Sequence, residues 1–148
     1  QWVYLLSFEQ KGEISASSEE MLKISFQRAN FCLELYKYIK DLHITKSDVY
    51  LLGMFSTIDA LVDAPVNEVI NEIPISDEVK KAIVAKEGKC GTLLKLIISY
   101  EKADWKNITV YAQELSVPLD ILAQIYFDCV ERVNEVWKNI VSQTSDFK

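Results

Sequence analysis

The chain has 148 residues, of which 49% are hydrophobic and 26% are charged, a balance typical of a folded domain rather than a disordered chain. Four glycines and three prolines are too few turn residues for an all-β sandwich or barrel. The glycines spell neither common phosphate-binding loop, and the single histidine, His43, excludes a metal site with several histidine ligands. A net charge of −6 with scattered lysines argues against nucleic acid and anionic membranes as partners.

The first residues predict the tail of a helix, followed by a loop. The segment Gln1–Phe8 is strongly apolar and has no cap before it, so we interpret the chain as a fragment of a longer protein, truncated at its N-terminus. Without the residues that cover it in the longer protein, this segment would form an exposed apolar patch that favours binding to another protein. We expect a homodimer or an exchanged N-terminal segment, formed through Trp2, Tyr4, Leu5, Leu6 and Phe8.

The next two predicted helices carry clear start signals. Ser17–Glu20 spells the capping box S-x-x-E, and a long helix with two adjoining apolar stripes should follow to about Lys40. A second cap begins at Thr45. The helix from Asp48 to about Val62 is apolar nearly all round, so we expect it at the centre of the domain.

Shorter helices follow. Pro65 suits the first turn of a short helix that ends near Ile73. Ser76 should cap the next helix, and Gly88 should terminate it.

The last part of the chain predicts an apolar helix from Cys90 to about Lys102, then a helix from Trp105 to Leu115 that Asp104 caps. A long helix opened by Pro118 completes the pattern. We predict one all-α domain of about seven or eight helices over residues 1–148.

The cysteines and the hydropathy indicate where the protein resides. Cys32, Cys90 and Cys129 lie far apart and form no C-x-x-C pair, which predicts free buried thiols in a reducing cytoplasm. No run approaches the roughly 18 apolar residues of a membrane span, and no signal peptide opens the chain. We therefore expect a cytoplasmic protein without membrane insertion.

Six segments in order carry a family pattern: RANFCLEL (28–35), VYLLGMFSTIDALVDAPV (49–66), EIPISDEVKKAI (72–83), EGKCGTLLKL (87–96), YEKADW (100–105) and YFDCVERV (126–133). Together they resemble the C-terminal part of an HDOD domain, the HD-related output domain of bacterial signalling proteins. The pattern is most similar to HDOD domains that follow an EAL domain in cyclic di-GMP signalling proteins. Their late G-D-W-like turn stands where this chain has Ala103-Asp104-Trp105. The resemblance implies an HD-like helical bundle, with an EAL domain before it in the full-length protein.

Under this resemblance, one pair of residues decides whether the domain could bind a catalytic metal. HD phosphohydrolases carry G-L-L-H-D-I-G on a central helix, where the His and Asp bind the metal that activates water. This chain has Ser56 and Thr57 in their place, and a neutral hydroxyl is a poor ligand for a divalent metal. The family's earlier histidine would fall near Gln27 or Arg28, where no histidine stands. The resemblance therefore implies a degenerate site without catalysis, metal or cofactor.

Neighbouring polar residues have two interpretations each. Asp59 and Asp63 lie four apart on the same face as Ser56, either as a residual metal or phosphate-water site or as a polar stripe at the end of the central helix. Arg28 is either an anion-binding group or an ion-pair partner, with acids on its own helix at Glu20 and Glu34.

Two further residues are interpreted as structural. His43 falls in a turn between helices, which favours a surface residue over a metal ligand. Trp105 is interpreted as a core or helix-packing anchor rather than a platform for a ligand.

The function that follows is a non-catalytic output or regulatory module of an EAL–HDOD protein. It would act through protein contacts, by self-association or with an attached signalling domain, and any phosphodiesterase activity would belong to the EAL domain. Two alternatives stay open: a metal-dependent phosphohydrolase that has moved its ligands, and an unrelated helical adaptor. An HD-derived fold would pack the Arg28 helix against the central helix with Ser56 facing it, which a regular up-down bundle does not require.

Overall fold

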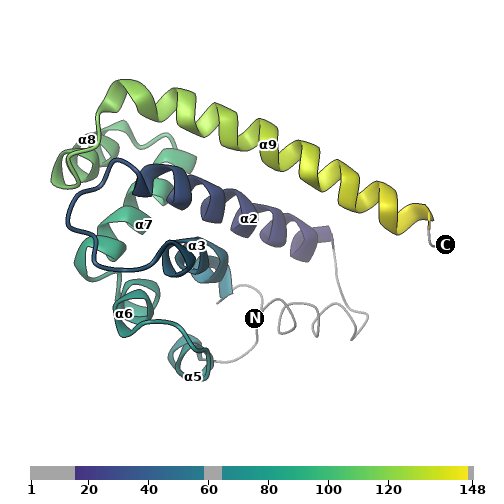
Figure 1. Ribbon diagram of the computed structural model, residues 1–148, viewed down its shortest axis with the longest axis horizontal. Coiled ribbons are helices and arrows are strands. Elements are labelled where there is room, and N and C mark those ends of the chain that lie inside the picture. The colour runs from purple at the N-terminus through teal and green to yellow at the C-terminus, as the bar shows by residue number, and fades with distance from the viewer. Residues whose placement is uncertain (1–15, 59–64, 147–148) are drawn as a thin grey trace.

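The computed structural model describes residues 16–58 and 65–146, and every regular element in these ranges is a helix (Figure 1). The predicted all-α class is confirmed. The elements are α2 (Ala16–Tyr36), α3 (Lys46–Met54), the 3-10 helix η1 (Phe55–Thr57), α5 (Val66–Asn71), α6 (Asp77–Ala85), α7 (Gly88–Glu101), α8 (Trp105–Glu114) and α9 (Leu119–Asp146). Among these described helices, none is long and apolar enough to cross a membrane.

Helix α2 lies at the centre of the arrangement. It packs against α3, η1, α7 and α9, while α6 bridges α3 and α7, and α8 packs on α7. Figure 1 shows α2 and α9 side by side and running in opposite directions, with α9 along the upper edge of the molecule. The end of α7 thereby lies within reach of both long helices.

Side-chain caps begin three helices where the sequence predicts them. In each case a side-chain oxygen accepts a hydrogen bond from the backbone N–H three residues later: Thr45 at 3.1 Å, Ser76 at 3.3 Å and Asp104 at 3.4 Å. These bonds satisfy N–H groups that have no partner inside the helix.

Two predicted helix boundaries are wrong, one at the start of a helix and one at its end. α2 begins at Ala16, so Ser17 lies within the helix rather than before its first residue. Gly88 does not terminate α6 but begins α7, because Lys86 ends α6 itself in the left-handed conformation with φ +57° and donates its N–H to the carbonyl of Ala82.

One predicted helix extends too far, and another is interrupted. α2 ends at Tyr36 rather than near Lys40, because the chain must turn there to bring α3 back against it. α3 gives way at Phe55 to η1, which places Ser56 and Thr57 in a tighter turn than an α-helix. Ile58 is helical again, and the predicted end of this helix near Val62 lies outside the described residues.

One hydrophobic core joins most of the helices, and its largest fully buried side chains include Phe31, Phe55 and Leu35. Cys32, Cys90 and Cys129 are buried and free, as predicted. Burial raises the pKa of Cys90 to about 12 and that of Cys129 to about 11, so both thiols stay protonated at neutral pH.

Candidate functional site

Side chains from three elements meet beside α2. Arg28 of α2 forms a bidentate ion pair with Glu101 at the end of α7, with Nη2–Oε1 at 2.8 Å and Nε–Oε2 at 2.9 Å. Its Nη1 also donates to Oγ of Ser56 in η1 at 3.2 Å, and that hydroxyl donates to the carbonyl of Gly53 at 2.7 Å. We call Arg28, Ser56 and Glu101 the arginine cluster. Two parallel charge-assisted bonds fix the guanidinium plane, which a single contact does not do.

The partner of Arg28 differs from the sequence expectation. Glu20 and Glu34 lie eight and six residues away on the same helix, whereas side chains meet on a helix surface at spacings of three or four. Glu34 instead pairs with Lys37 at 3.1 Å and with Arg132 at 3.4 Å. Arg28 is therefore a cross-helix ion-pair partner, with a side chain only 13% exposed.

A glycine brings the two helices of this site together. At Gly53 the backbone of α3 lies so close to α2 that a Cβ atom would come 2.6 Å from the carbonyl carbon of Arg28 and closer still to the backbone of Ala29. This close approach positions η1, one turn later, within reach of the Arg28 side chain. The Arg28 helix thus packs against α3, with Ser56 of η1 facing Arg28.

Thr57 belongs to a separate buried pair. Its hydroxyl hydrogen-bonds to that of Ser25, and Ser25 donates to the carbonyl of Met21 at 2.9 Å. Ser25 is 0% exposed and Thr57 2% exposed, so these hydroxyls satisfy each other within the contact between α2 and η1. Thr57 is therefore a packing residue and does not face the arginine cluster.

An aromatic group adjoins the arginine cluster, and sequence reasoning missed it. Tyr100 precedes Glu101 and contacts Phe31, Trp105 and Tyr126, with ring centroids 5.8, 5.8 and 4.8 Å apart. Burial and the nearby Glu101 carboxylate raise the pKa of Tyr126. Trp105 is 63% exposed, so it is not a core residue, but its ring makes an edge-to-face contact between α8 and Tyr100 of α7.

The residues present do not fit a divalent metal at this position. A guanidinium is always protonated and would repel a metal ion, and the nearby hydroxyls are weak ligands. Within the described residues, no three side chains of His, Cys, Asp or Glu are placed to hold a metal ion.

Several residues singled out from the sequence lie elsewhere. Asp59 and Asp63 fall outside the described residues, as does the predicted interaction surface of Trp2, Tyr4, Leu5, Leu6 and Phe8. His43 is exposed in the connection between α2 and α3, which confirms its interpretation as a surface residue.

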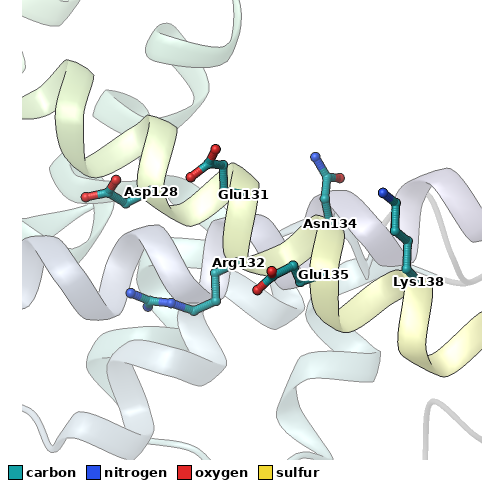
Figure 2. A pocket seen from close by; sticks show the side chains of 6 residues that line it. All are labelled: Asp128, Glu131, Arg132, Asn134, Glu135 and Lys138. Carbon is teal, nitrogen blue, oxygen red and sulfur yellow. The ribbon is translucent and has the colours of Figure 1, made fainter.

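A shallow hollow of about 480 Å³ lies along the outer side of α9 (Figure 2). Its lining residues all belong to that helix: Asp128, Glu131, Arg132, Asn134, Glu135 and Lys138. Figure 2 shows Glu131, Asn134 and Lys138 along one edge of α9 and Arg132 toward the opposite edge. An open surface with charges of both signs suits contact with another protein better than capture of a small molecule.

Sequence comparison relates the chain to part of two longer proteins. No protein-family model matches it, and no solved structure matches it. The chain is 36% identical over 110 residues to the cyclic di-GMP phosphodiesterase CdgJ of Vibrio cholerae, which covers 74% of this chain and 25% of that protein. The chain resembles part of a cyclic di-GMP signalling protein.

A second relative is also much longer than this chain. The chain is 31% identical over 115 residues to the uncharacterized protein YuxH of Bacillus subtilis, which covers 77% of this chain and 28% of the relative. The chain therefore spans about a quarter of the length of both relatives.

Proposed function

We propose that the chain is a non-catalytic output or regulatory module of HDOD type in a cytoplasmic bacterial protein of cyclic di-GMP signalling, and that it acts through protein contacts. The arginine cluster carries this proposal. In it a permanent cation, Arg28, is bound by Glu101 and by Ser56, and Ser56 stands where the HD resemblance implies a metal ligand. The similarity to a segment of CdgJ supports the signalling context.

The arginine cluster suits a module that transmits a conformational change. Arg28, Ser56 and Glu101 come from α2, η1 and α7, so their bonds connect segments that lie 28 and 73 residues apart in sequence. A partner that binds more tightly when these bonds are intact, or when they are broken, shifts the balance between the two arrangements. The exposed Trp105 and the partly exposed Tyr126 lie beside this network and offer such a partner apolar surface.

The experiment measures cyclic di-GMP hydrolysis by the 148-residue chain and by the protein at its full gene-encoded length. The chain alone should show no turnover with Mn²⁺ or Fe²⁺, and should contain less than about a tenth of an equivalent of metal after purification without chelator. In the full-length protein, Arg28→Met should change the hydrolysis rate or the affinity for cyclic di-GMP about threefold or more, because it breaks the bonds to Glu101 and Ser56.

The matched control is Lys81→Met, which removes an exposed cation on α6, away from the arginine cluster and from α9. It should leave both quantities unchanged. Stoichiometric metal together with turnover by the chain alone would instead establish a metal-dependent phosphohydrolase. Equal effects of the two variants would contradict a regulatory role for the arginine cluster.

A further inference from the structure

Helix α9 carries two rows of residues, and only one of them faces the core. The core row is buried and consists of Leu122, Ile125, Cys129 and Val133. A second row recurs at spacings of four and three residues, the a and d spacing of a coiled coil. We call these residues the second row: Ala123, Phe127, Val130, Asn134 and Trp137.

The second row lies about 120° round the helix from the core row, at 100° per residue. Phe127 is 58% exposed, and Val130, Asn134 and Trp137 are each partly exposed. Asn134 is the one polar large side chain in the row. A single asparagine among apolar a and d residues typically fixes the register of paired helices at some cost in stability.

The charges beside the second row are self-complementary. Glu131 and Lys138 are seven residues apart on the flank of the row, and Figure 2 shows both on the same edge of α9 as Asn134, which lies between them. If a second α9 runs antiparallel across this face, Glu131 faces Lys138 of the second copy, and the same pair forms again through the twofold axis. In a parallel pair these flanking residues would not meet each other.

We propose that the second row of α9 binds α9 of a second copy of this chain in an antiparallel, twofold-symmetric contact. Asn134 then lies near the axis and faces Trp137 of the second copy, whose indole N–H can donate to the asparagine side chain. α9 lies along the upper edge of the molecule (Figure 1), and Ala123 and Phe127 of the second row are exposed. The second copy would be a protein partner of the kind that the proposed function requires. The dimer itself is inferred independently of that function, and only its role in signalling rests on it.

Sedimentation equilibrium of the 148-residue chain over a dilution series tests the contact. The chain should dimerise, and Glu131→Lys alone should raise the dimer dissociation constant about tenfold, because it turns two attractive pairs into two repulsive ones. Lys138→Glu alone should do the same. The double variant Glu131→Lys/Lys138→Glu should return the dissociation constant to within about threefold of the original, because the exchanged charges again face each other.

Glu135→Lys is the matched control, since it makes the same change in charge on α9 but lies further from the second row. It should leave the dissociation constant within about twofold. A monomer at every concentration overturns the inference, and so does a dimer that Glu131→Lys and Glu135→Lys weaken equally, which would place the contact elsewhere, for example at the apolar N-terminal residues. Single variants that weaken a dimer without rescue by the double variant overturn the antiparallel arrangement. None of these results bears on metal content or hydrolysis, so the proposed function succeeds or fails separately.

Discussion

Gly53 decides how closely α2 and α3 approach. Alanine normally favours a helix over glycine by about 1 kcal/mol. Here the added Cβ would meet the backbone of Arg28 and Ala29, which cannot rotate away as a side chain does. We expect Gly53→Ala to lower the free energy of unfolding by about 2–3 kcal/mol in urea titrations. Ser47→Ala, exposed on the same helix, should change it by less than about 0.5 kcal/mol, and a Gly53→Ala protein as stable as the original would contradict the close crossing.

Ala103 occupies a conformation that suits glycine. Its φ is +55°, and the turn closes with hydrogen bonds from its N–H to the carbonyl of Tyr100 at 3.1 Å and from Asp104 to Ser99 at 2.9 Å. This is the Schellman pattern, in which the left-handed residue after the helix is usually glycine. Ala103→Gly should raise the free energy of unfolding by about 0.5–1 kcal/mol, measured as a shift in the urea midpoint. The neighbouring exposed residue offers a control, because Lys102→Gly has no left-handed strain to relieve and should destabilise.

Helices α2 and α9 are joined at Glu34, which accepts hydrogen bonds from Lys37 and Arg132. Burial works to raise the pKa of Glu34, but the bonds and charges of these two residues outweigh it and hold that pKa below its ordinary value of 4.5. A carboxyl with a lowered pKa stabilises the fold above its unfolded pKa and loses this contribution as the pH falls through its folded pKa. We expect Glu34→Gln to cost about 0.5 kcal/mol at pH 7, a small value because both cations are largely exposed.

The difference in unfolding free energy between Glu34→Gln and the original should shrink as the pH falls below 4.5 and vanish once the Glu34 carboxyl is protonated in the folded protein as well. Urea titrations at several pH values measure it. A difference that stayed constant from pH 7 to pH 3 would show that the charge of Glu34 contributes nothing.

Helix starts were easier to predict than helix ends, and the reason is chemical. Thr45, Ser76 and Asp104 each carry an oxygen that can bond to the first turn, so the residue type itself indicates a start. The ends of α6 and α7 are formed by Lys86 and Ala103 in left-handed conformations without glycine. The usual glycine signal is absent there, and it misleads at Gly88, which begins a helix instead.

Across the whole molecule, the sequence predicted the juxtaposition of Arg28 and Ser56 through a family resemblance but not the residue that completes it. Glu101 lies 73 residues from Arg28, and no periodicity connects them. The aromatic group is equally non-local, because Phe31, Tyr100, Trp105 and Tyr126 come from four different helices. Local patterns specify the elements, whereas contacts between distant side chains emerge only when those elements are packed.

The bidentate pair of Arg28 and Glu101 has a consequence for how this fold can evolve. Introducing histidine at position 56 would not create a metal centre, because the new ligand would face the fixed positive charge of Arg28. Removing Arg28 first would strand the Glu101 carboxylate beside Tyr126 without its counter-charge, at a cost in stability. Each single step toward a metal centre is therefore disfavoured on its own. The arginine cluster therefore opposes a stepwise change from this ion pair to a metal site at position 56.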